Sequence, residues 1–461
     1  MKLRRIMIAA PKSGSGKTTV TCALLRALAD MGQQVCAYKC GPDYIDPMFH
    51  RAVLGVSSKN LDTFFTGEET TRRLFLKDRT ENETAVLEGV MGLFDGLGGT
   101  REEGSAYHLA KVTKTPILLV VDAKGMGRSV LPLIAGFLAY DTEHLIQGVI
   151  LNRMSKSYFT LLKPLIETEL KIKAVGCLPN ETAFQIESRH LGLQLPEEIT
   201  DLRERIGKAA EAFAASVSVE EILKIAESAE ELESAKEPET VKKSGIVEEN
   251  KNAPILAVAK DEAFCFYYED NLRLLEEYGA RLRYFSPLHD TALPEGTYGI
   301  LIGGGYPELY GKELSANEQM RAAIRKAFSE GMPLVAECGG FMYLHSFLTV
   351  DGIRYPMAGV VPEECRNTGK LVRFGYIELR EKKTCFLPEG ETIRGHEFHY
   401  FDSTDNGDGF LARKPVTGRE YSCMITGENY CIGFPHLYYP SNPEFVKCFV
   451  EKMKERYSDK K

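Results

Sequence analysis

Several features of membrane and secreted proteins are missing from this sequence. Among its 461 residues there is no run of about 18 apolar residues, which argues against a membrane-spanning helix. The first residues lead directly into a short apolar segment, without the pattern of a signal peptide. Tryptophan is also absent, which excludes nothing by itself. We therefore expect a cytoplasmic protein with no membrane partner.

Positive charge and paired cysteines are scarce as well. Lys and Arg number 57 against 65 Asp and Glu, which gives a net charge of −8. A chain without a basic excess has little with which to neutralise phosphates, so we expect no general nucleic-acid partner. The eleven cysteines are an odd number, and Cys36 and Cys40 lack a second close pair that would complete a zinc site. We interpret them as free thiols in a reducing compartment.

A glycine-rich segment at residues 10–19, APKSGSGKTT, follows an apolar run at residues 6–9 and precedes a helical apolar pattern. A strand, a glycine-rich turn and a helix are the context of a phosphate-binding loop. We expect Lys17 to reach the β- and γ-phosphates of ATP and the Thr18 hydroxyl to bind Mg²⁺. Pro11 replaces the usual first glycine and fixes the start of the turn. The predicted nucleotide-binding residues of this segment are Gly14, Ser15, Gly16, Lys17, Thr18 and Thr19.

Further apolar runs alternate with helical patterns in the N-terminal half, which predicts a doubly wound parallel α/β sheet. These runs lie at residues 35–39, 84–87, 116–121 and 147–151. Ligands on such sheets bind at the carboxyl ends of the strands. The side chains that follow the runs are acidic or polar: Asp43, Asp46, Glu88, Asp122 and Asn152. Asn152 either contacts the adenine of the nucleotide or simply begins a turn.

A change of composition divides the chain, which is too long for one core. Residues 227–251 contain eight Glu, four Lys and no aromatic residue, too little apolar surface to order a segment. We predict an N-terminal domain at residues 1–225, a charged linker at 226–253 and a C-terminal domain at 254–461. Apolar runs resume beyond the linker and predict a second α/β domain. They lie at residues 255–258, 282–285, 300–302 and 333–336.

The second domain carries a cysteine on a sharp turn between a strand and a helix, residues 333–344. This is the arrangement of a nucleophile elbow, whose flanking positions must be small, as Ala336 and Gly340 are. A thiol at a helix N-terminus is expected to have a lowered pKa, so Cys338 is the predicted nucleophile. The backbone N–H groups of three glycines are candidates for an oxyanion hole. These are Gly304, Gly305 and Gly339.

A nucleophilic cysteine also needs a base. Five histidines of the second domain are candidates: His289, His345, His396, His399 and His436. We favour His436 because it follows the elbow late in the chain. The pair His396 and His399 is three residues apart rather than four, so it does not match H-E-x-x-H.

Several longer segments resemble known families. The N-terminal domain resembles the dethiobiotin-synthetase-like P-loop amide-forming enzymes, and the C-terminal domain resembles class I glutamine amidotransferases. Their pairing in one chain is similar to the cobyrinate a,c-diamide synthase family over nearly the whole length. The segments that carry the resemblance are residues 39–46 (KCGPDYID), 87–96 (LEGVMGLFDG), 261–271 (DEAFCFYYEDN), 285–290 (FSPLHD), 303–310 (GGGYPELY), 336–344 (AECGGFMYL) and 394–400 (RGHEFHY).

The resemblance implies an ATP- and glutamine-dependent amidation of the a and c acetate carboxylates of a corrinoid, through an acyl phosphate. Its implied cofactors are ATP and Mg²⁺, and L-glutamine and the corrinoid are its small-molecule substrates. In the first domain Asp43 and Glu88 would complete the Mg²⁺ site with Thr18. Asp46 and Tyr44 match positions associated with the corrinoid carboxylate and its activation.

In the second domain the resemblance makes Cys338 the glutaminase nucleophile and His436 the residue that activates it. Many amidotransferases place a Glu two residues after the histidine, and Tyr438 occupies that position here. The third member of the triad therefore stays open. Arg189 and His190 either meet a substrate carboxylate or form a surface ion pair.

Two alternatives remain open on the sequence. The same chemistry could act on hydrogenobyrinate or a nickel sirohydrochlorin. From a different class, the first domain could be a partition-type ATPase switch beside a degenerate second domain, which would leave the segment GPDYID without an explanation. The oligomeric state is equally open, a homo-oligomer included.

Overall fold

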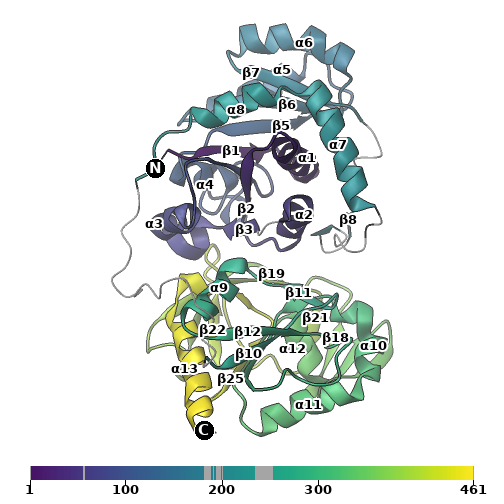
Figure 1. Ribbon diagram of the computed structural model, residues 1–461, viewed down its shortest axis with the longest axis vertical. Helices are drawn as coiled ribbons and strands as arrows, with labels where there is room; N and C mark the ends of the chain where they lie inside the picture. Colours follow the sequence, from purple (N-terminus) through teal and green to yellow (C-terminus); the bar gives the residue numbers. More distant parts are fainter. Residues whose placement is uncertain are drawn as a thin grey trace. The chain divides into compact units, whose positions relative to one another are not determined.

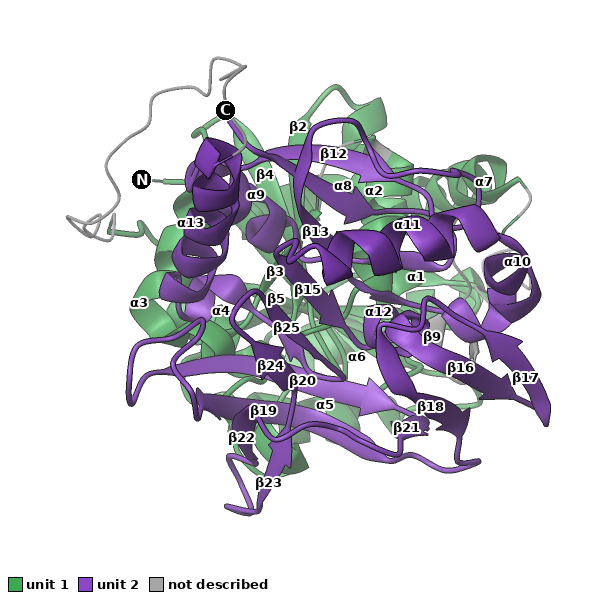
Figure 2. Cartoon of the chain, turned by 90° about the horizontal axis from the view of Figure 1, so that it is seen from below, with its two compact units in different colours: residues 1–241 green, residues 242–461 purple. Residues whose placement is uncertain are grey.

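Buried parallel strands lie at the centre of each of the two compact units into which the chain divides, residues 1–241 and 242–461 (Figure 2). The computed structural model describes residues 2–55, 58–180, 188–189, 192–193, 199, 201–233 and 253–459. Of the predicted linker, residues 226 and 227 complete helix α8, and residues 234–252 lie outside the described residues. Within the described residues, no helix is long and apolar enough to cross a membrane.

The sheet of the first unit consists of seven parallel strands in the order β3-β2-β4-β1-β5-β6-β7 (Figure 1). Its strands are β1 (Arg4–Ala9), β2 (Gln34–Cys40), β3 (Ser58–Leu61), β4 (Glu83–Glu88), β5 (Ile117–Asp122), β6 (Ile146–Asn152) and β7 (Lys173–Leu178). Residues 117–121 of β5 are fully buried, as expected of a parallel strand covered on both faces. The predicted doubly wound parallel α/β fold is confirmed.

Helices cover this sheet, and their apolar faces meet alternate strand residues. Ile6 and Ile8 of β1 share one hydrophobic cluster with α1, α7 and α8, because successive strand residues point to opposite faces. The helices of the unit are α1 (Lys17–Asp30), α2 (Ile45–Leu54), α3 (Thr63–Leu76), α4 (Ala106–Val112), α5 (Val130–Tyr140), α6 (Lys156–Glu169), α7 (Leu202–Ser216) and α8 (Val219–Glu227). Minor elements are η1 (Leu97–Gly99) and the antiparallel pair β8 (Ser188–Arg189) and β9 (Gly192–Leu193).

The main sheet of the second unit has the order β12-β10-β13-β15-β25-β24, and only its edge pair β24–β25 is antiparallel. Its strands are β10 (Ile255–Ala259), β12 (Arg281–Phe285), β13 (Thr297–Ile302), β15 (Leu334–Glu337), β24 (Ile425–Gly427) and β25 (Tyr430–Gly433). Alternate residues belong to two separate cores: Leu334 and Ala336 of β15 to one, and Val335 to the other. All four strands predicted in this domain lie in this sheet.

Much of the second unit is antiparallel structure that the sequence analysis did not predict. Five strands are ordered β23-β22-β19-β20-β26, four are ordered β17-β16-β18-β21, and β11 pairs with β14. These strands are β11 (Phe264–Phe266), β14 (Gly304–Gly305), β16 (His345–Val350), β17 (Ile353–Pro356), β18 (Val361–Asn367), β19 (Arg373–Glu381), β20 (Thr392–His399), β21 (Phe401–Ser403), β22 (Phe410–Arg413), β23 (Glu420–Cys423) and β26 (His436–Leu437). The helical segments are α9 (Glu269–Glu277), η4 (Pro307–Tyr310), α10 (Gly311–Ala316), α11 (Glu318–Ser329), α12 (Gly339–Leu344), η5 (Tyr439–Ser441) and α13 (Glu444–Asp459).

The turn between β15 and α12 is tightly constrained. Cys338 has φ 47° and ψ −102°, a backbone conformation that is costly for any residue other than glycine. A Cβ atom on Gly340 would lie 2.1 Å from the carbonyl oxygen of Ile302. The small residue predicted at position 340 is therefore required by contact with the neighbouring strand β13.

We expect Gly340→Ala to lower the free energy of unfolding by about 2–3 kcal/mol, because backbone atoms must move to admit the methyl group. The matched control is Gly207→Ala in α7, where nothing lies within 4 Å of the added Cβ. That change should stabilise the helix by about 0.5–1 kcal/mol. Denaturant unfolding of both variants measures the difference, and a Gly340→Ala variant as stable as the parent would contradict the packing described here.

Candidate active sites

The phosphate-loop segment of the first unit is held in place by a side chain from another strand. Gly14 and Gly16 have φ values of 75° and 94°, which favour glycine. A Cβ on Gly16 would lie 2.2 Å from Nδ2 of Asn152, and that Nδ2 donates a hydrogen bond to the carbonyl oxygen of Ser15 at 2.8 Å. Asn152 therefore fastens the loop, while its predicted contact with adenine stays a prediction.

Lys17 begins helix α1 and is largely buried. Its Nζ donates to the carbonyl oxygen of Met91 at 2.6 Å. Burial, together with the nearby positive charge of Lys39, lowers the pKa of Lys17 to about 8. The charged form of Lys17 is thus destabilised by its surroundings, and a bound anion such as a phosphate would stabilise it.

Strand register places a lysine beside an acidic residue next to the loop. Lys39 of β2 and Glu88 of β4 are direct partners in the parallel ladder. Nζ of Lys39 lies 3.1 Å from Oε1 of Glu88 and 2.5 Å from Oδ2 of Asp46, and all three side chains are buried. Burial alone would lower the pKa of Lys39, but the two carboxylates outweigh it and raise that pKa above its ordinary value.

Thr18 joins this cluster through its hydroxyl. Its Oγ1 donates to Oε1 of Glu88 at 2.7 Å and lies 3.3 Å from Oδ1 of Asp46. Asp43 is engaged differently: its Oδ1 accepts from the backbone N–H groups of Ile45 at 2.8 Å and of Asp46 at 3.2 Å, at the start of α2. Of the two aspartates in GPDYID, the structure therefore brings Asp46 to Thr18.

These oxygen atoms suit Mg²⁺, which prefers one or two carboxylates together with phosphate oxygens and water. Thr18, Glu88 and Asp46 would hold the ion. Within the described part of the chain, no group of three or more His, Cys, Asp or Glu side chains is arranged as a metal site. A closed, all-protein metal cage is thus not part of the described structure, and the donor set fits an ion shared with a nucleotide.

Two residues of this cluster were not assigned from the sequence. Lys39 lies within a motif quoted for the family resemblance, and its pairing with Glu88 follows from the parallel register. His50 is four residues after Asp46 on α2, a spacing that places both on one helix face. Its Nε2 lies 2.8 Å from Oε2 of Glu88. That spacing was the signal that could have found it.

The remaining predicted residues of the first unit are placed as follows. Thr19 lies in the first turn of α1, and Tyr44 is buried directly before α2. Arg189 belongs to the short strand β8, and His190 lies outside the described residues. The substrate role predicted for Arg189 and His190 stays a prediction.

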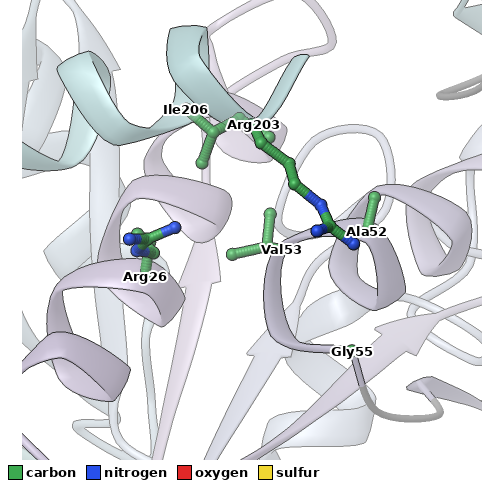
Figure 3. A pocket seen from close by; sticks show the side chains of 6 residues that line it. All are labelled: Arg26, Ala52, Val53, Gly55, Arg203 and Ile206. Carbon is green, nitrogen blue, oxygen red and sulfur yellow. The ribbon is translucent and has the colours of Figure 1, made fainter. Parts of the chain in front are cut away.

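A hollow of about 280 Å³ lies between α1, α2 and α7 (Figure 3). It is lined by Arg26, Ala52, Val53, Gly55, Arg203 and Ile206. None of the predicted site residues lines it. The hollow therefore gives no support to the nucleotide site predicted at the carboxyl ends of the strands.

In the second unit, Cys338 sits at the elbow with its backbone fixed on both sides. Its N–H donates to Gly433 O at 2.8 Å, and its carbonyl oxygen accepts from Met342 N at 2.9 Å. Burial, followed by the charge of Glu308, raises the pKa of the thiol well above its ordinary value. The expected lowered pKa is therefore wrong for the resting site, because burial outweighs the short helix α12. The thiol needs a base to lose its proton.

His436 lies on β26, where its backbone pairs with His396 of β20. The two imidazole rings stack with centroids 4.8 Å apart at an interplanar angle of 14°. Burial lowers the pKa of His436 to about 3, so the ring is neutral near pH 7.

The three predicted oxyanion glycines lie together around this histidine. A Cβ on Gly339 would lie 3.0 Å from the backbone nitrogen of Gly305, and one on Gly304 would lie 2.5 Å from Cε1 of His436. Side chains at these positions would collide with the site. Their contribution of N–H groups to an oxyanion hole stays a prediction.

Of the other four candidate histidines, His396 stacks on His436, and the remaining three are engaged elsewhere. His345 contacts Phe341 O at 2.7 Å and Ser403 Oγ at 2.7 Å through its two ring nitrogens. His289 is exposed and pairs with Glu262. His399 stacks on Phe434, with its Nδ1 2.7 Å from the carbonyl oxygen of Phe401. Of these candidates, His436 lies against Gly304 of β14.

Two family models match the chain. The CobQ/CobB/MinD/ParA nucleotide binding domain matches residues 6–193, and the CobB/CobQ-like glutamine amidotransferase domain matches residues 255–425. The two models confirm a P-loop nucleotide-binding domain followed by a glutamine amidotransferase domain.

Relatives of full length are similar to the whole chain. A protein of Caldanaerobacter subterraneus subsp. tengcongensis is 40% identical over 97% of this chain and 98% of its own length. One of Listeria innocua is 40% identical over 96% of this chain and 98% of its own. One of Picrophilus torridus is 36% identical over 98% and 99%. All three are named cobyrinate a,c-diamide synthase, and on this similarity the chain belongs to the cobyrinate a,c-diamide synthase family of glutamine-dependent ligases.

Proposed function

We propose that this enzyme uses ATP and glutamine to amidate the a and c acetate carboxylates of cobyrinate. The observation that carries the proposal is the hydroxyl of Thr18, hydrogen-bonded to buried Glu88 beside a phosphate-loop segment, in a chain that also presents Cys338 on an elbow. The first half suits phosphoryl transfer and the second suits glutamine hydrolysis. The names of the relatives supply the corrinoid substrate.

The first unit would activate the substrate carboxylate. A carboxylate oxygen attacks the γ-phosphorus of ATP, the bond to ADP breaks, and an acyl phosphate forms. Ammonia then attacks the acyl carbon, and inorganic phosphate leaves with the electrons of the C–O bond. Lys17 would hold the β- and γ-phosphates, and Mg²⁺ held by Thr18, Glu88 and Asp46 would supply charge neutralisation. Tyr44, next to these residues in sequence, is proposed to face the corrinoid.

The second unit would release the ammonia. Cys338 attacks the side-chain amide of glutamine, and His436 takes the thiol proton and passes it to the leaving nitrogen. The negatively charged oxygen that develops on the amide carbon would be stabilised by N–H groups of Gly304, Gly305 and Gly339. Water hydrolyses the thioester and returns the free thiol with glutamate.

The decisive test is mass spectrometry of cobyrinate incubated with ATP, Mg²⁺ and glutamine, which should yield a monoamide and then a diamide. Cys338→Ala should lose the glutamine-dependent reaction and keep the reaction with ammonium salts, because only the nitrogen source is removed. Cys448→Ala, which replaces a partly exposed cysteine of helix α13, is the control. Loss of both reactions in a folded Cys338→Ala variant would contradict separate sites.

Nucleotide binding should take up a proton near pH 8. Lys17 has a pKa of about 8 in the free protein, and phosphates would raise it, so the protonated form binds and ATP affinity falls as the pH rises through 8. Titration calorimetry at pH 8 in buffers of different ionisation enthalpy measures this uptake. It should vanish in Lys17→Met and persist in Lys12→Met, which removes an exposed lysine of the same loop. Equal uptake in both variants would refute the role of Lys17.

The two aspartates should separate in their effects. Asp46→Asn removes the carboxyl group beside Thr18 and should lower the amidation rate with ammonia on the order of 10²-fold. Mg²⁺ should also bind more weakly, so a higher Mg²⁺ concentration should be needed for the half-maximal rate. Asp43→Asn keeps an oxygen that accepts the same backbone N–H groups, so its rate should fall only a few-fold. A larger loss of rate in Asp43→Asn than in Asp46→Asn would contradict this assignment. It would make Asp43 the residue that binds Mg²⁺ with Glu88 and Thr18, as the family resemblance implies.

A further inference from the structure

Glu337 is the last residue of β15 and directly precedes the elbow cysteine. It is only 5% exposed, although a carboxyl group at the end of a central strand is costly to bury. Its Oε1 accepts a hydrogen bond from the hydroxyl of Tyr439 at 3.1 Å, and Tyr439 is itself buried. One carboxyl oxygen is thereby fixed, and the orientation of the other is set with it.

The second oxygen faces the proposed base. Oε2 of Glu337 lies 4.0 Å from Nδ1 of His436, beyond hydrogen-bond distance, and the carboxyl group also accepts a hydrogen bond from the backbone of Leu437. Catalytic contacts are often long in ligand-free sites and tighten when substrate binds. Glu337 therefore stands on the Nδ1 side of the ring, where an orienting carboxylate belongs if Nε2 is to accept the thiol proton.

Glu397, whose charge acts on His436, has other partners. Glu397 is buried too, but its carboxylate accepts from Tyr421 and lies 3.6 Å from Nζ of Lys414. Position 438, where many amidotransferases carry the glutamate of the triad, is a tyrosine whose hydroxyl donates to Asp270 at 3.3 Å. The carboxyl group that meets Nδ1 thus comes from a different strand.

We propose that Glu337 is the positioning residue of His436, taking the place of the missing glutamate after the histidine; this rests on the glutaminase role proposed for Cys338. Oε2 would accept a hydrogen bond from Nδ1–H of His436. Nε2 of the same ring would then face the thiol and accept its proton. The S–H bond of Cys338 then breaks as its proton moves to Nε2, sulfur bonds to the amide carbon, and the proton leaves with the nitrogen as ammonia. Glu337 forms no bond to substrate.

Burial opposes charge on both groups. It raises the pKa of Glu337 to about 8 and lowers that of His436 to about 3, so each is mostly uncharged near pH 7. An imidazolium formed beside an ionised Glu337 would offset part of that cost.

The test is glutamate release from glutamine by Glu337→Gln, which keeps the shape of the side chain and removes its ability to ionise. We expect kcat to fall about 10- to 100-fold while KM for glutamine changes less than about 3-fold, because orientation of the base is lost and the binding site is not. Inactivation by an electrophilic glutamine analogue should slow in parallel. Ammonia-dependent amidation should stay at the wild-type rate.

Glu381→Gln is the matched control, since Glu381 is equally buried in the same unit and accepts backbone N–H groups of residues 385–387. Wild-type kcat in Glu337→Gln would overturn the proposal, and so would equal losses in both variants. Tyr439→Phe, which frees Oε1, should lower kcat by a smaller factor even if Glu337→Gln does not fold, and an unchanged kcat there would count against the proposal. Glutamine hydrolysis that survives in Cys338→Ala would instead refute the proposed nucleophile.

Discussion

The contact of Lys39 with Asp46 and Glu88 is the interaction on which the phosphate end of the first unit depends. Three ionisable side chains are buried there, one each from β2, α2 and β4. Removing one partner of such a buried set typically costs about 3–5 kcal/mol, because the charges left behind are uncompensated. The same two carboxyl groups lie beside the hydroxyl of Thr18. One group of side chains therefore both stabilises this end of the sheet and forms part of the candidate site.

Burial has a second effect, which both units share. It lowers the pKa of Lys17 to about 8 and that of His436 to about 3, and it raises that of Cys338. Each shift favours the uncharged form while no substrate is present. In the first unit phosphates would supply the missing opposite charge. In the mechanism proposed for the second unit, the proton would pass from Cys338 to His436, so the surroundings of His436 would matter more than the thiol's own acidity.

Contiguous motifs were readable from the sequence. The segment of residues 10–19 and the turn around Cys338 each combine a strand, a turn and a helix within about 15 residues, so local patterns alone identify them. The parallel sheets followed from apolar runs in the same way. The antiparallel strands of the second unit were not predicted, because half-exposed strands such as β19 mix polar and apolar residues and lack a buried run.

By itself the sequence determined the two α/β units, the phosphate-loop segment, the elbow and the family to which they belong. Only the tertiary structure decided which aspartate meets Thr18, and that Lys39, His50 and Glu337 lie beside the predicted residues. The reason is geometric. Strand register joins Lys39 to Glu88 across 49 positions of the chain. The register of β15 with β25 places Glu337 opposite Gly433, close to His436 in the chain. No local pattern encodes a distance of that kind.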